Sequence, residues 1–390
     1  MPKPASNAAA EPAAVAAWRI SRRFLRVFLD VSSVPDMPCS LSHCCPAASL
    51  VAPPRAAVFH NGFDLATAGC CALHPPDVAL HARCQKTVIR ACYAARGIRS
   101  GHAFVGDTFL TTTRIAVVGD IHHGQDTQTK RGSMALALLD RFVAEVNRGS
   151  FDAVIDLGDR ISDEDPERDR LLQSDVAMCF ARLAVAHHHL SGNHDVACLT
   201  LADNEALFDL PSGSRALIIG DVRCVFWQPD VRLTRARGLH LSAGDLDVLV
   251  RLLGQDDRPT LLVSHVPLSG HAQTGNYYFE ANPRHATYAE AAEIRQAIAD
   301  APCPVVALAG HVHWNTLTTV DATPHLTLQS LTETFISGDP AEAFGVLEIE
   351  SDELRWVVRG REPVSIKLPW PTKKSRWRAP LPSFATSGAA

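Results

Sequence analysis

Short apolar runs recur along the chain between residues 115 and 308, and they predict buried β-strands. The runs mostly lack the polar alternation of a strand with one face in water, which is typical of strands covered on both faces. They are Ile115–Val118, Ala153–Leu157, Ala184–Leu190, Thr260–Val263 and Val305–Leu308. A further pair of runs, Arg215–Ile219 and Arg223–Trp227, predicts a hairpin because turn-forming residues join them.

Helix-like stretches separate several of these runs. They are Met134–Asn147, Glu167–Leu183, Ala243–Leu253 and Ala286–Asp300. Ser242 is a candidate N-cap of the third, since Asp245 follows at capping-box spacing. Alternating strands and helices predict parallel strand pairs with right-handed crossovers. The carboxyl ends of such strands line a common crevice, so residues that follow them can meet there.

After residue 313 the pattern changes from alternating elements to strands alone. Four short runs are separated by turn residues, and they are Thr316–Val320, His325–Gln329, Phe344–Ile349 and Leu354–Val358. Close spacing of this kind predicts antiparallel pairing. We therefore expect a second, antiparallel sheet, and an α/β architecture of two packed sheets with helices outside.

Composition is that of an ordinary globular protein. The 390 residues are 46% hydrophobic and 20% charged, and the formal net charge of −5 gives no general nucleic-acid signal. No apolar stretch has the length of a membrane helix, and no secretory signal is evident. We expect a cytoplasmic protein without membrane contact; the sequence does not indicate its oligomeric state.

The two ends of the chain differ from the middle. Residues 1–110 are rich in Ala, Pro, Cys and Arg, and their seven cysteines form no C-x-x-C pair. We expect an irregular or disordered extension here, or a translation start placed too far upstream. Residues 366–390 are expected to form an irregular basic tail, which leaves 111–365 as the folded domain.

Five polar motifs follow the predicted strands. They are Gly-Asp-Ile-His at 119–122, Gly-Asp-Arg at 158–160, Gly-Asn-His-Asp at 192–195, Ser-His at 264–265 and Gly-His-Val-His at 310–313. A single Asp after a strand is usually a turn or a helix cap, and a single His is often a core residue. Together, however, the motifs supply enough carboxylate, amide and imidazole groups for two divalent metals.

In this order the motifs resemble those of the calcineurin-like metallophosphoesterases, over roughly residues 113–360. The resemblance implies a four-layer α/β/β/α sandwich with two mixed sheets, and a pair of divalent ions such as Mn²⁺, Fe²⁺ or Zn²⁺. It implies that the first ion is held by Asp120, His122 and His313, the second by Asn193, His265 and His311, and both by Asp159 as the bridge. It also implies a catalytic role for His194, with Asp195 as its orienting partner.

One motif departs from the family pattern. Many members have a second Asp three residues after the bridging one, whereas this chain has Ser162 there and Asp163 one residue later. The proposed bridge is unaffected. The surroundings of the bridge, and any arginine that clamps phosphate, stay open, with Arg160 as a weak candidate for that clamp.

The sequence thus predicts a metal-dependent phosphoesterase that uses a metal-activated hydroxide on phosphate mono- or diesters of small molecules, with nucleotides as candidate substrates. The alternative is an inactive scaffold or binding protein that retains the fold. Tyr277, Tyr278, Phe279 and Trp314 lie near the motifs, and either stacking on a flat leaving group or packing explains them. The triplet at 187–189 is all His, but it lies within a predicted strand and alternating burial accounts for it.

Overall fold

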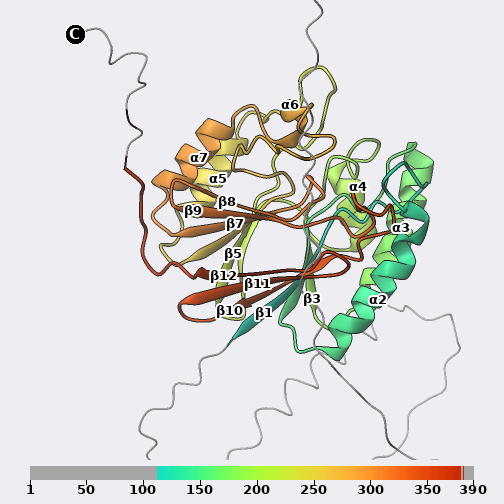
Figure 1. Ribbon diagram of the computed structural model, residues 1–390, viewed down its shortest axis with the longest axis horizontal. Coiled ribbons are helices and arrows are strands. Elements are labelled where there is room, and N and C mark those ends of the chain that lie inside the picture. Colours follow the sequence, from blue (N-terminus) through green and yellow to red (C-terminus); the bar gives the residue numbers. More distant parts are fainter. Residues whose placement is uncertain (1–111, 379–380, 382–390) are drawn as a thin grey trace, which may run out of the picture. The chain divides into compact units, whose positions relative to one another are not determined.

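The computed structural model describes residues 112–378 and 381, which build two six-stranded β-sheets (Figure 1). The predictions made for residues 1–110 lie outside the described residues. The strand order is β12-β11-β10-β1-β2-β3 in the first sheet and β4-β5-β6-β7-β9-β8 in the second. Both sheets are mixed, because β1, β2 and β3 pair in parallel, as do β5, β6, β7 and β9, while the remaining pairs are antiparallel.

Eleven of the twelve strands in the described residues overlap the runs predicted from the sequence, whereas β12 was not predicted and β9 begins two residues before its predicted run. Those of the first sheet are β1 (Thr113–Val118), β2 (Ala153–Asp156), β3 (Ala186–His189), β10 (Phe344–Ile349), β11 (Glu353–Arg359) and β12 (Val364–Pro369). Those of the second sheet are β4 (Arg215–Ile219), β5 (Val222–Phe226), β6 (Thr260–Val263), β7 (Val305–Ala309), β8 (Thr316–Val320) and β9 (Thr323–Thr327). The predicted hairpin is the β4–β5 pair.

Each central strand is buried on both faces. On β1, Ile115 and Val117 belong to the core between the sheets, together with Leu261 of the second sheet. Ala116 and Val118 belong to a separate core that the first sheet forms with its helices. Because alternate side chains enter two different cores, the strand shows no polar alternation.

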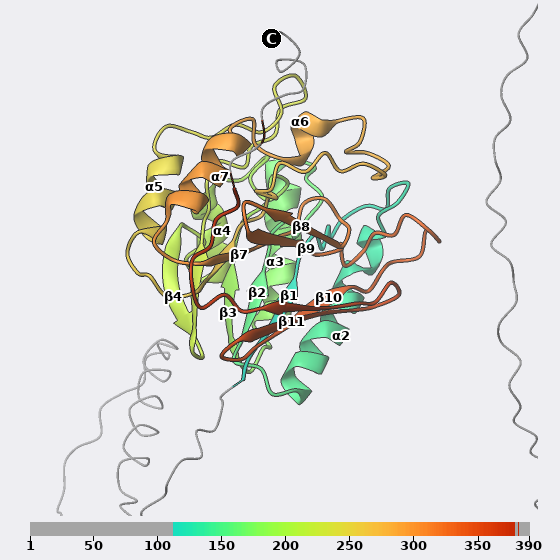
Figure 2. The ribbon, with the colours of Figure 1, turned by 60° about the vertical axis from the view of Figure 1, so that its left-hand side comes forward.

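Helices cover the outer face of each sheet (Figures 1 and 2). The first sheet carries α2 (Ala135–Arg148) and α3 (Pro166–Phe180), with α4 (Leu201–Phe208) beside α3, and the second carries α5 (Asp245–Leu253) and α7 (Ala291–Asp300). Two short elements, η1 (Gly132–Met134) and α6 (Pro283–Ala286), lie in loops. The result is the four-layer α/β/β/α sandwich predicted from the sequence.

The strands after residue 313 correct one prediction. They do not form a separate antiparallel sheet, because β10, β11 and β12 extend the first sheet from β1, whereas β8 and β9 extend the second from β7. Unpaired backbone groups at the edges of β1 and β7 need partners, and these strands supply them. The predicted domain end at residue 365 also falls inside β12, so the folded region reaches at least Pro369.

Two local predictions about helices were also incomplete. Helix α5 has Gly244 as its N-cap, with φ 89°, and not Ser242; the Asp245 carboxylate accepts the Ser242 backbone N–H at 2.7 Å. Helix α4 was not predicted, although Thr200 and Asp203 form a capping box at its start. None of the helices in the described part of the chain combines the length and the hydrophobicity needed to cross a bilayer.

Candidate metal centre

Five of the predicted ligand residues have left-handed backbone conformations. The φ angles are 50° at Asp120, 48° at His122, 54° at Asp159, 69° at His311 and 60° at His313. These residues directly follow β1, β2 and β7, at the carboxyl ends of the strands. Such angles are uncommon for residues with a Cβ, and this kind of strain concentrates at functional sites. The sharp turns keep the side chains at the edge shared by the two sheets.

Two glycines let the loops approach each other closely. A Cβ on Gly192 would lie 2.1 Å from Asp159 Oδ1 and 2.6 Å from His265 Cε1. A Cβ on Gly310 would lie 2.6 Å from Asp120 Oδ2. Any larger residue at either position would therefore displace a predicted ligand, which explains why the motifs carry Gly there.

The first cluster brings together Asp120, His122, Asp159 and His313. One ligand atom of each lies within 4.8 Å of all the others. The Nε2 atoms of His122 and His313 are 3.0 Å apart, and His313 Nε2 is 3.3 Å from Asp120 Oδ1. Ligands about 2.1 Å from one tetrahedral ion are about 3.4 Å from each other. The spacing therefore fits a divalent metal.

The second cluster brings together Asp159, His265 and His311, again within 4.8 Å. His265 Nε2 is 3.4 Å from Asp159 Oδ2 and 3.4 Å from the amide oxygen of Asn193. His265 Nδ1 donates to a backbone carbonyl, that of Leu157, at 2.9 Å, and this bond fixes which nitrogen faces the cluster. Asp159 belongs to both clusters, which is the position that the sequence predicts for a bridge. All seven predicted ligand side chains thus converge on one place.

The buried carboxylates give the centre a negative field. Burial alone would lower the pKa of His313 and His265, but Glu333 and Asp120 raise the first to about 10, and Asp159 raises the second to about 9. Burial lowers the pKa of His311 to about 3, assisted by the charge of His265. The same carboxylate charge would stabilise a divalent cation, so the donor set fits metals in charge as well as in spacing.

Glu333 is a member of the site that the sequence analysis missed. Its side chain is fully buried, and its carboxylate pairs with His313 Nδ1 and accepts the Tyr277 hydroxyl at 2.9 Å. Burial would raise its pKa, but the charge and hydrogen bond of His313 outweigh burial and lower it to about 2. One indication of this role was present in the sequence, since Glu333 is the sole Asp, Glu, Lys or Arg within residues 322–338. It orients His313, as carboxylates commonly do for ligating histidines.

The partner of His194 is Asp163 and not Asp195, which corrects a prediction. His194 Nδ1 pairs with the Asp163 carboxylate, and the hydrogen bond from His194 lowers the pKa of Asp163. His194 also lies edge-on to His122, with ring centroids 4.8 Å apart, and its backbone N–H donates to Asp159. Asp163 is the acid displaced by one position from the family pattern, so that displacement was the available signal.

Asp195 instead organises the loop after β2. It is fully buried, and its oxygens accept the backbone N–H groups of Asp159, Arg160 and Gly192 at 2.8 to 2.9 Å. Arg160 is buried beside it and is held by Asp156, also a carboxylate, at 3.0 Å. Within the described residues no hydrogen bond or ion pair joins Asp195 to the His194 side chain, because backbone donors, Gln173 and Arg160 take up its oxygens. Arg160 is likewise committed to the interior, which removes it as a phosphate clamp.

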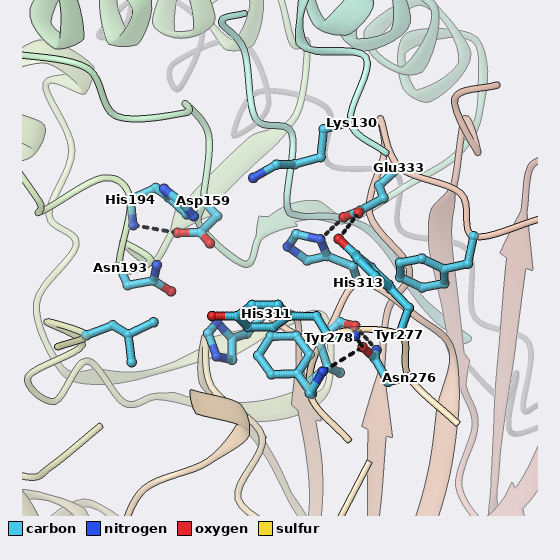
Figure 3. A pocket seen from close by; sticks show the side chains of 14 residues that line it. Lys130, Asp159, Asn193, His194, Asn276, Tyr277, Tyr278, His311, His313 and Glu333 are labelled. Atoms are coloured by element: carbon cyan, nitrogen blue, oxygen red, sulfur yellow. Dashed lines mark hydrogen bonds and ion pairs between the residues drawn. The ribbon is translucent and has the colours of Figure 1, made fainter. Parts of the chain in front are cut away.

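A pocket of about 280 Å³ opens in front of the clusters (Figure 3). Asp159, Asn193, His194, His311 and His313 form its floor, and residues outside the predicted ligand set complete it. These are Lys130, Leu233, Asn276, Tyr277, Tyr278, Phe279, Val312, Glu333 and Phe335. The volume is close to the lower end for small-molecule sites, about 300 Å³. The pocket therefore has the size of a small-molecule site beside both clusters.

Comparisons with known proteins bear on the family and the fold of the chain. The family model for calcineurin-like phosphoesterases matches residues 113–315. Among solved structures, a dimetal phosphatase from Danio rerio is 15% identical, with 66% of this chain and 99% of that chain covered and a TM-score of 0.53. A purple acid phosphatase from yellow lupin (Lupinus luteus) seeds is 14% identical, with 67% and 54% covered and a TM-score of 0.49.

A Vps29 from Entamoeba histolytica in complex with Zn²⁺ is also similar, at 15% identity, with 66% and 100% covered and a TM-score of 0.33. A search of curated proteins gave no significant match. At identities this low, the structural likeness concerns the fold.

Proposed function

Because the chain belongs to the calcineurin-like phosphoesterase family, we propose that it hydrolyses phosphate mono- or diesters of small molecules at a centre of two divalent metals. The observation that carries this proposal is the convergence of seven ligand side chains into two clusters that share Asp159. Asp120, His122 and His313 would complete the site of one metal, and Asn193, His265 and His311 that of the other. Mixed oxygen and imidazole ligands of this kind suit Mn²⁺, Fe²⁺ or Zn²⁺.

When bound, the metals supply positive charge for the phosphate oxygens and make a water molecule acidic enough to attack phosphorus. The chain contributes the charge balance of the site. Two carboxylates, Asp120 and Asp159, leave a net positive charge on a centre of two divalent ions, since the other ligands are neutral. That charge favours an anionic substrate.

His194 is the proposed proton donor to the leaving oxygen. Its Nδ1 is held by Asp163, which leaves Nε2 for the pocket that the ring lines. The Asp163 carboxylate fixes the orientation of the ring, as a positioned general acid requires. His194 also borders both clusters through Asp159 and His122, so a leaving group beside the clusters is within its reach.

The test is metal content together with hydrolysis of two synthetic esters. The purified protein is expected to bind two equivalents of Mn²⁺ or Zn²⁺, and to cleave nitrophenyl phosphate, bis-nitrophenyl phosphate or both. The ratio of the two rates separates a monoesterase from a diesterase. Stoichiometric metal without cleavage of either ester under Mn²⁺, Zn²⁺ or Ni²⁺ would refute the proposed catalysis and favour the scaffold alternative.

A further inference from the structure

We propose that the pocket is a nucleoside phosphate site, in which Tyr277, Tyr278 and Phe335 receive the base and Lys130 contacts the phosphate. We call the three aromatic residues the aromatic wall. The inference rests on the proposed phosphoesterase function and names its substrate class. Four observations support it: the exposure of the wall, its rigid support, the position of Lys130 and the size of the pocket.

The aromatic wall exposes apolar rings at the mouth of a polar site. Tyr277 is 58% exposed and Tyr278 is 39% exposed, although both line the pocket. The Tyr277 and Phe335 rings lie 4.9 Å apart between centroids, at 47°. Exposed rings on one side of a pocket bury apolar area when a flat group stacks on them. Contacts within the protein therefore leave part of both tyrosines open for a ligand to cover.

The wall is held in place by the metal centre itself. The Tyr277 hydroxyl donates to Glu333, the same carboxylate that orients His313 (Figure 3). Asn276 is fully buried, and its side chain donates to the carbonyl of Val312, between His311 and His313, at 3.0 Å. The same side chain accepts the backbone N–H of Tyr278 at 3.1 Å. A binding surface fixed in this way loses little conformational freedom when a ligand arrives.

Lys130 provides a cation on the opposite side of the pocket. In Figure 3 its ammonium points into the space between His194 and His313. Among the ion pairs of the described residues none involves Lys130, so its charge is available to a ligand. Its backbone forms a β-bridge with Glu333, which anchors the loop that carries it.

The pocket thus offers phosphate oxygens a cation beside the metal clusters and offers a ring system an aromatic surface. A volume of about 280 Å³ is the size of a small-molecule site. A simple alkyl or glycerol ester would leave the rings exposed. Stacking on an aromatic side chain gives about 1–3 kcal/mol per base and accepts any base. A nucleoside phosphate is small, and it carries both a phosphate for the cation and a base for the aromatic wall.

The experiment compares two uncleavable ligands, the phosphonate analogues of adenosine 5′-phosphate and of ribose 5-phosphate, in which a P–C bond replaces the ester. Both carry the same charge and differ only in the base. Isothermal titration of the Mn²⁺-loaded protein should show that the adenosine compound binds about tenfold more tightly. Tyr277→Ala should bring the ratio close to one, and Tyr277→Phe should keep it because the ring remains.

Lys130→Ala should weaken the binding of both ligands by about the same factor, roughly tenfold, and leave their ratio intact. Leu317→Ala on β8, an exposed apolar residue outside the pocket, is the matched control and should change neither affinity. Equal affinities in the unmodified protein, no binding of either ligand, or a ratio that survives Tyr277→Ala would overturn the inference.

The two proposals fail in different ways. Ester hydrolysis without any preference for the adenosine compound would leave the phosphoesterase function standing and remove the nucleoside site. A clear preference for the adenosine compound without hydrolysis of any ester would support the nucleoside site and refute the phosphoesterase function.

Discussion

Two histidine-rich regions lie at β3 and at the ends of the strands, and they behave differently. In β3, His187, His188 and His189 are adjacent in sequence, whereas the histidines of the candidate metal centre come from loops far apart in the chain. His189 is bonded on both nitrogens, to Asp156 at 2.8 Å and to His187 at 2.7 Å. His188 instead packs beside Phe226 of the second sheet. In the described part of the chain, the groups able to hold a metal do not include this triplet.

The difference shows that a metal site needs side chains from separate loops to meet at one point, and that several histidines close together in sequence do not suffice. A strand sends successive side chains to opposite faces, so three adjacent histidines cannot share one ion. Left-handed turns at Asp120, Asp159 and His311 instead aim side chains from two sheets at a common point. Four experiments with substituted proteins break or sharpen this comparison.

The largest effect is expected from Asp159→Asn, since both clusters lose the shared carboxylate. We expect loss of both metals and a drop in kcat/KM of about 10⁴-fold, because a metal pair contributes several kcal/mol to the transition state. Metal analysis of the purified variant, with ester hydrolysis, measures both. His188→Ala in the triplet is the control and should keep full metal content and activity. Two tightly held metals in Asp159→Asn would contradict the bridge.

The next largest effect is expected from His194→Ala. Loss of the proton donor should lower kcat about 10²- to 10³-fold, while both metals stay bound because this residue is not a ligand. Asp163→Asn should give a smaller decrease and should alter the pH profile of kcat. Asp195→Asn should instead lower the midpoint of thermal unfolding, since Asp195 holds three backbone N–H groups. Full activity of His194→Ala with both metals present would remove its assigned role.

A smaller effect is expected from Glu333→Gln. The amide keeps the shape of the side chain but removes the charge that orients His313, so the first cluster should bind its metal about 10- to 100-fold more weakly. Affinity at the second cluster should stay the same, because His265 and His311 donate to backbone carbonyls and not to Glu333. Titration with Mn²⁺ should therefore resolve two affinities. An equal weakening of both would show that the clusters are coupled through the loop.

The smallest effect on activity is expected from His189→Gln, which should instead change how stability depends on pH. Burial lowers the pKa of His189 to about 4. Between pH 6.5 and 4 the unfolded chain takes up a proton at this residue and the folded protein does not, so stability is full above pH 6.5 and falls as the pH drops.

This one group contributes a fall of about 3 kcal/mol across that window. Urea unfolding at pH 7 and pH 5 should show a shallower fall in His189→Gln than in the unmodified protein. An identical pH dependence in the two proteins would mean that the pKa of His189 is the same in the folded and the unfolded chain.

The strands and the predicted ligands follow from the sequence because both depend on local patterns. Continuous apolar runs identified β1, β2, β6 and β7, and four of the five motifs lie where these runs end, while the fifth follows β3. The sorting of β8 to β12 between the sheets depends on which edges are free, and no local pattern encodes that. Helix α4 follows a capping box, but its polar positions gave no clear periodic stripe.

The residues that support the site were harder to predict than the ligands. Asp195 stands next to His194 in sequence, yet the chain turns its carboxylate into the loop, and Asp163 from a different loop reaches the imidazole. Glu333 and Lys130 belong to segments without a recognisable motif, and only the folded chain brings them to the pocket. Adjacency in sequence was therefore a poor guide to partners of the catalytic histidine.

Each cluster takes groups from both layers of the β-sandwich: Asp159 comes from the loop after β2 in the first sheet, while His313, His265 and His311 come from loops after β7 and β6 in the second. Ions bound there would link the two sheets to each other. The free energy of their binding would then also oppose the separation of the layers. The temperature of unfolding would then rise with the metal concentration, and a chelator would lower the stability of the protein as well as its activity.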